Sequence, residues 1–80
     1  MGRMSEVEFC WVIRRDDGRF YVTTRRDRNR LRHITDDRLI YALRENSESE
    51  AQETIDVYEL EGYKPVKIEI RVVEDEKETN

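Results

Sequence analysis

Apolar and polar side chains alternate with a period of two near the start of the chain. Apolar residues occupy every second position from residue 7 to residue 13, namely Val7, Phe9, Trp11 and Ile13. This pattern is typical of a strand with one buried face. An Asp-Asp-Gly segment follows at 16–18, and Asp-Gly favours tight hairpin turns because glycine tolerates positive φ. Residues 19–24 are rich in aromatic and β-branched side chains, so we predict a β-hairpin over residues 7–24.

A helix is predicted over residues 48–61. Ser47 and Glu50 have the spacing of a capping box, in which each side chain accepts a hydrogen bond from a backbone N–H at the helix start. Ala51, Ile55 and Tyr58 follow at helical spacing and define its apolar face. Gly62 is the expected end of this helix. Residues 66–72 then alternate again and predict a half-buried strand.

The segment from residue 34 to residue 43 has two interpretations. Thr35 as cap, Asp36 and Asp37 in the first turn, and Ile34 packed on Leu39 favour a short helical turn. The alternative is a short third strand through residues 39–43.

These segments predict one α+β domain. We expect the order β-β-(helical turn)-α-β, with a three-stranded, mainly antiparallel sheet and one helix on one face. Residues 1–6 are expected to be an N-terminal extension, 7–73 the single domain, and 74–80 a disordered acidic tail. Because Cys10 and Val12 point away from the Trp11 face, the second sheet face is expected to be partly apolar. Such a face, or an open sheet edge, invites dimerisation or strand addition by a partner.

Arginine dominates one stretch of the chain. Five of the nine residues at 25–33 are Arg, and this run is too highly charged to be buried, so we expect an exposed loop or an extension of the hairpin. The charge is unevenly spread around the net value of −4. Residues 1–44 hold eleven Arg and seven acidic residues, whereas residues 45–80 hold four basic and twelve acidic residues.

The arginine run is the strongest candidate for a binding site. Its guanidinium groups suit an acidic protein surface, and they also suit the phosphates of a nucleic acid, although an overall acidic chain is unusual for a nucleic-acid-binding domain. A solvated loop, or one paired with the acidic residues of the predicted helix, is the alternative without a partner. The candidate partner-binding residues are Arg14, Arg15, Arg25, Arg26, Arg28, Arg30, Arg32 and His33. Tyr21, Tyr41, Tyr58 and Tyr63 are the candidates for an additional interface.

No catalytic or metal-binding set is recognisable. His33 is the only histidine and Cys10 the only cysteine, and no Gly-x-Ser-x-Gly segment is present. His33, Asp36 and Asp37 do not match a usual metal-ligand spacing, so neither a metal nor another cofactor is expected. A single cysteine excludes an internal disulfide, which fits a cytoplasmic location, and no stretch is apolar enough to span a membrane.

The order of the segments resembles a class of small phage and prophage open reading frames. The matching segments are the aromatic strand and turn at 11–18, Asp36 to Leu39 with Ala42, the Ser-capped helix start at 47–51 with Ile55, and the valine-rich strand at 66–73. The resemblance implies a phage or mobile-element protein that binds other proteins, including host defence proteins that it would inhibit. We therefore expect a non-enzymatic protein-binding module, with a nucleic-acid-binding accessory protein and a structural homo-oligomer as the alternatives.

Overall fold

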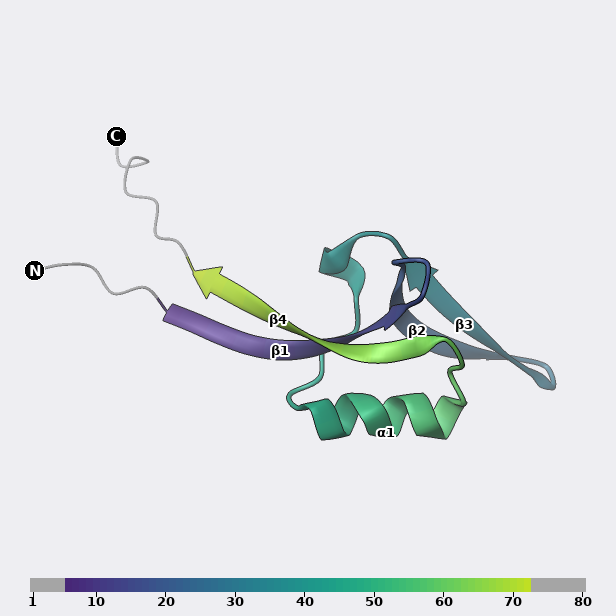
Figure 1. Ribbon diagram of the computed structural model, residues 1–80. Helices are drawn as coiled ribbons and strands as arrows, with labels where there is room; N and C mark the ends of the chain where they lie inside the picture. Colours follow the sequence, from purple (N-terminus) through teal and green to yellow (C-terminus); the bar gives the residue numbers. More distant parts are fainter. Residues whose placement is uncertain (1–5, 73–80) are drawn as a thin grey trace, which may run out of the picture.

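The computed structural model describes residues 6–72 and contains one helix packed on a four-stranded sheet (Figure 1). The strands are β1 (Glu6–Arg15), β2 (Phe20–Asp27), β3 (Arg30–Asp36) and β4 (Tyr63–Val72), with the 3₁₀ helix η1 (Leu39–Tyr41) and the α-helix α1 (Glu48–Tyr58) between β3 and β4. All neighbouring strands are antiparallel, in the order β3-β2-β1-β4. The predicted α+β class is confirmed. The predicted strand count was too low because the arginine run forms part of a hairpin, one of the two expected alternatives.

The boundaries of the domain differ slightly from the expectation. Glu6 belongs to β1 rather than to an N-terminal extension. The remainder of that extension, and the predicted acidic tail, lie outside the described residues.

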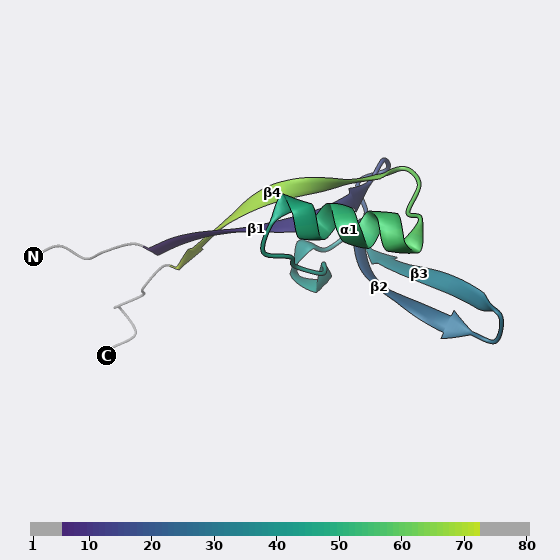
Figure 2. The same cartoon turned by 90° about the horizontal axis from the view of Figure 1, so that it is seen from below.

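The sheet divides into two strand pairs that diverge. β1 and β4 are paired along their whole length, from Glu6 opposite Val72 to Arg15 opposite Tyr63. By contrast, β1 and β2 are paired only beside their connecting turn, at Arg14 and Phe20. Beyond that point the two pairs point in different directions (Figures 1 and 2).

The segment before α1 fills the space that opens between β1 and β2. Glu45 exchanges two backbone hydrogen bonds of 2.8 Å with Trp11, and Leu43 donates one of 3.0 Å to the carbonyl oxygen of Tyr21. These bonds satisfy backbone groups that would otherwise be left without partners where the strands separate.

The main core lies between the sheet and α1. Ala51 and Ile55 of α1 pack with Ile13, Tyr21 and Leu60, as the helical spacing predicted for the first two. Trp11, Leu43 and Tyr63 border this cluster. Cys10, Val12 and Ala42 are also buried but stand outside the cluster. Cys10 and Val12 alternate with Trp11 and Ile13, so they face the other side of the sheet, where Figure 1 shows η1.

The predicted helix start at residue 48 with Ser47 as cap is confirmed, and the predicted helix end at residue 61 is wrong. Ser47 Oγ accepts a hydrogen bond of 3.1 Å from the N–H of Glu50, but the Glu50 carboxylate accepts from the N–H of Asn46, one residue before the expected donor. At the other end, the left-handed position is Glu59, with φ of 53°, rather than Gly62. Gly62 also has positive φ, but it serves the turn into β4.

The segment at 34–43 contains the predicted short helical turn, later than expected, and the alternative strand through residues 39–43 is wrong. β3 continues to Asp36, so Ile34 and Thr35 are strand residues and do not staple or cap a helix. The helical turn is η1, and the Asp36 carboxylate receives the N–H of Arg38 just before it. Within residues 6–72, no helix is both long enough and apolar enough to cross a membrane.

Candidate functional site

The far ends of β2 and β3 form a two-stranded projection, which we call the arginine hairpin and define as residues 25–33. Figures 1 and 2 show it extending beyond the end of α1 and away from β1 and β4. All five of its arginines are exposed: Arg25, Arg26, Arg28, Arg30 and Arg32. Strand pairing gives these charges fixed positions that a loop would not provide.

A two-residue turn closes the hairpin between Asp27 and Arg30. Arg28 adopts a φ of 61° in this turn, a conformation that a long side chain takes up only at a cost of about 1–2 kcal/mol. This turn is hard to predict locally because glycine does not occupy the position with positive φ. Asn29, a common turn residue, was the remaining local signal.

Strand pairing brings arginines directly opposite each other. Arg25 faces Arg32 across the two strands, and Arg30 shares their side of the ribbon because it lies two residues from Arg32. Directly opposed like charges in a sheet are destabilising. Asp27, opposite Arg30, is the single acidic residue of the hairpin.

The hairpin arginines have no ionic partner in the described part of the chain. The ion pairs of residues 6–72 are Arg15–Asp17, Arg38–Asp36 and Arg71–Glu69, and none involves the hairpin. Five Arg and one Asp give residues 25–33 a formal charge of +4, taking His33 as neutral, while the whole chain carries −4. The rest of the chain therefore carries −8, and the hairpin is a basic projection from an acidic body.

A chain of hydrogen bonds fastens the base of the hairpin to the core. The hydroxyl of Tyr21, whose side chain is 2 % exposed, lies 2.6 Å from Thr24 Oγ1, which lies 3.0 Å from His33 Nδ1. The rings of Tyr21 and His33 are 6.4 Å apart. Burial raises the pKa of Tyr21, so this hydroxyl stays protonated at neutral pH. His33 thus anchors the hairpin, and its Nδ1 is already engaged.

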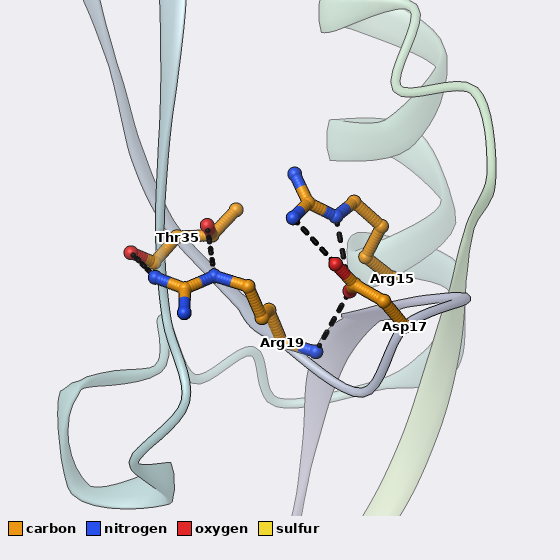
Figure 3. A network of polar contacts seen from close by, with 4 residues as sticks. All are labelled: Arg15, Asp17, Arg19 and Thr35. Atoms are coloured by element: carbon orange, nitrogen blue, oxygen red, sulfur yellow. Dashed lines mark hydrogen bonds and ion pairs between the residues drawn. The ribbon is translucent and has the colours of Figure 1, made fainter.

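The predicted basic patch is divided by the structure. Arg14 and Arg15 are at the end of β1, beside the start of β2. The length of the eight-residue β2, about 25 Å, separates them from the hairpin turn. The Arg15 guanidinium is held by Asp17, with its Nη2 2.7 Å and its Nε 3.0 Å from the two carboxylate oxygens (Figure 3). This pair raises the pKa of Arg15 and lowers the pKa of Asp17 to about 2. Arg15 is therefore committed to the turn.

Arg19 also has a structural role. Its guanidinium donates to both oxygens of Thr35, at 2.9 Å each, and so ties the end of β3 to the turn after β1 (Figure 3). Of the arginines near this turn, Arg14 is exposed and makes no ion pair with a described residue. The candidate site therefore reduces to the hairpin itself.

The four tyrosines do not form one surface. Tyr21 belongs to the core, so its assignment as an interface candidate is corrected. Tyr63 borders the same core and meets Tyr21 edge to face at 6.2 Å. Tyr41 is 48 % exposed on η1, where the Arg38 guanidinium carbon lies 4.6 Å from its ring centre. Tyr58 is at the end of α1 and is 36 % exposed.

One apolar residue was missing from the predicted site. Leu31 is 48 % exposed on the hairpin, directly opposite Arg26. A shallow depression of about 400 Å³ is lined by Leu31 with Asp27, Arg30 and Arg32. Leu31 could have been identified from the sequence as the one apolar residue of the arginine run, between Arg30 and Arg32.

The hairpin offers binding chemistry and lacks the parts of a metal centre. In the described residues, no group of three or more His, Cys, Asp or Glu side chains is arranged to hold a metal ion.

Comparisons with protein-family models, with curated proteins and with solved structures produced no match.

Proposed function

We propose that this chain is a non-enzymatic binding module that attaches to an acidic protein surface through the arginine hairpin. The observation that carries the proposal is the set of five exposed guanidiniums on a projecting ribbon, without an ionic partner among residues 6–72. Arg25 and Arg32, directly opposite each other, repel in the free protein. An anionic partner would relieve that repulsion, so binding and hairpin stability should be coupled.

The chemistry of arginine favours carboxylates as the groups contacted. Each guanidinium presents a planar fork of donors that can bond both oxygens of a carboxylate, as Arg15 does with Asp17 in this chain. Since the rest of the chain carries −8, an extended polyanion would be repelled by the body, whereas a local acidic patch would meet mainly the hairpin. Leu31 shares its side of the ribbon with Arg26, opposite which it lies, and would supply apolar contact beside that guanidinium.

The resemblance to small phage proteins gives the proposal a biological setting. A phage or mobile-element protein of this size would act by occupying the surface of a host protein, including a defence protein. The outer edge of β3 lies beside the guanidiniums and is unpaired in the sheet order. It would allow the partner to add backbone hydrogen bonds to the ionic contacts.

The proposal is tested by reversing the charge of the hairpin. In the triple variant Arg26→Glu, Arg28→Glu and Arg30→Glu, capture of partner proteins from host lysate should be abolished, while far-UV circular dichroism reports an intact fold. The matched control replaces the same three residues by Lys, which keeps the charge and removes the planar fork. Partial capture by the Lys variant is expected. Equal capture by the wild-type and Glu variants would refute the proposal.

The shape of the hairpin supports nucleic-acid binding as a second candidate. The major groove of DNA admits a two-stranded β-ribbon, and the arginine hairpin is such a ribbon. With up to five phosphate contacts, this candidate predicts binding to duplex DNA that weakens by a factor of about 10²–10³ between about 50 and 200 mM salt. Fluorescence anisotropy with a labelled duplex measures it. Binding that is steep in salt and lost in the Glu variant would favour nucleic acid over protein, and no binding at the lower salt would eliminate it.

A further inference from the structure

The outer edge of β4 has a pattern of side chains and backbone groups that is complementary to the same edge of a second copy. β4 is the last strand of the sheet, and Figure 2 shows no helix or strand of residues 6–72 beyond it on that side. The direction of its backbone groups follows from β1. Because the N–H and C=O of Trp11 are bonded to Glu45 on the β2 side, those of Cys10 and Val12 face β4. Their partners are Ile68 and Val66.

The odd-numbered residues of β4 therefore direct their N–H and C=O groups outward. Their side chains lie on the same side as Trp11 and Ile13, which is the side of α1. The even-numbered residues place Val66, Ile68 and Ile70 on the other side of the sheet, where all three are half-buried. The outward backbone positions are Tyr63, Pro65, Lys67, Glu69 and Arg71.

We propose that β4 pairs antiparallel with β4 of a second copy, with Lys67 opposite Glu69 of the second copy and Ile68 opposite its own equivalent. A twofold axis through Ile68 then creates two Lys–Glu pairs on the α1 side. On the other side it places Val66 against Ile70 twice and Ile68 against Ile68. Opposite charges directly across antiparallel strands are stabilising, and the aliphatic pairs remove apolar surface from water.

The charges select this register over its neighbours. Sliding one strand by two residues keeps the backbone groups aligned but places either Lys67 opposite Lys67 or Glu69 opposite Glu69. Both of these registers bring like charges together, which is destabilising. The existing contacts are compatible with the favoured register. The Lys67 ammonium lies 4.5 Å from the centre of the Phe9 ring, with spare donors for a carboxylate. Glu69 accepts a hydrogen bond of 3.0 Å from Arg71 Nε through Oε2, and its carboxylate has further acceptor capacity for Lys67 of the second copy.

Pro65 limits the extent of the pairing. Proline on an edge strand lacks the donor that a neighbouring strand needs, and it often protects an edge from aggregation. In the proposed register Pro65 lies opposite Arg71 of the second copy, near the end of the paired segment, so the central bonds of Lys67 and Glu69 are kept. An isologous contact of this kind uses both β4 edges and closes at a dimer.

The dimer would be independent of the function proposed for the arginine hairpin. β3 and β4 are opposite edges of the sheet, so pairing through β4 leaves both hairpins free. The result is one continuous antiparallel sheet with an arginine hairpin on each half. Such an assembly would bind two acidic surfaces at once, with a gain in avidity if they belong to one partner.

Charge reversal and restoration test the proposal on the full chain. Analytical ultracentrifugation should show a species of twice the 9.7 kDa chain mass. Lys67→Glu and Glu69→Lys should each weaken dimerisation about 10-fold, because each turns two attractive pairs into repulsive ones. The double variant Lys67→Glu/Glu69→Lys should restore it. Circular dichroism of each variant checks that the monomer remains folded.

Several outcomes would overturn the proposal. These are a wild-type monomer throughout the measurable concentration range, a dimer that survives the single reversals, or a double variant that stays dissociated. Loss of the dimer in the hairpin Glu variant, with no effect of the β4 variants, would place the interface on the hairpin instead. That last outcome would also count against capture of another protein by the hairpin, whereas the other outcomes do not bear on partner capture, which is measured separately.

Discussion

The β1–β4 pair and the β2–β3 pair have the same antiparallel backbone but different surroundings. α1 covers one side of the first pair, and β1 contributes Ile13 to the core. The second pair contributes Tyr21 at its base, and all of its residues from Arg25 to Arg32 are exposed. A two-stranded ribbon is at best marginally stable alone in water. The first pair therefore carries most of the contacts with α1, whereas the second projects into solvent and is the pair that we propose for recognition.

The largest expected difference between the two regions concerns apolar truncation. Ile13→Ala removes a fully buried side chain from the core and should lower the free energy of unfolding by about 3 kcal/mol. Leu31→Ala on the hairpin is the matched control and should cost less than about 0.5 kcal/mol. Urea denaturation measures both. Similar losses would show that the hairpin contributes to the stability of the domain.

A smaller effect is expected where the two regions join. Tyr21→Phe removes the hydroxyl that bonds to Thr24 and should cost about 1 kcal/mol. Because the bond fastens the hairpin, amide exchange should accelerate at residues 25–33 more than in α1. Tyr41→Phe removes an exposed phenol hydroxyl and serves as the control. Uniform acceleration throughout the chain would contradict an anchoring role.

A gain of similar or smaller size is expected at the end of α1. Glu59 holds a positive φ, which costs a non-glycine residue about 1–2 kcal/mol, and its charge opposes the helix dipole. Glu59→Gly removes both penalties but increases the freedom of the unfolded chain, so we expect a net gain of about 0.5–1 kcal/mol. Glu61→Gly, whose φ is not positive, should give no gain. Thermal denaturation compares the two.

The smallest effect concerns acid stability at the turn between β1 and β2. The pKa of Asp17 falls from 3.8 to about 2 on folding, mainly through its bonds with Arg15. Its contribution to stability is therefore present above pH 4 and lost as the pH falls towards 2. In Asp17→Asn, which keeps an oxygen for the N–H of Arg19, that part of the pH dependence should vanish. Denaturation at pH 2, 4 and 7 tests this, and identical pH profiles would contradict it.

Local sequence patterns determined most of the secondary structure of this chain. The period-two segments became β1 and β4, and the Ser47 cap with Ala51 and Ile55 became α1, because each signal involves residues within a few positions of one another. The exposure of the arginine run also followed from sequence, since five neighbouring guanidiniums cannot be desolvated. The predicted helix end was wrong because Glu59, rather than the expected Gly62, occupies the left-handed position that ends α1.

Only the tertiary structure decided which of these residues act together. Arg15 and Arg19 resemble the hairpin arginines in sequence, yet contacts with Asp17 and Thr35 commit them to the fold. Tyr21 is drawn into the core by packing across the sheet. The separation of β2 from β1, the insertion of residues 43–45 and the open edge of β4 all depend on contacts between distant segments. Such contacts arise from the sum of packing and backbone bonding over the whole chain, which no local pattern encodes.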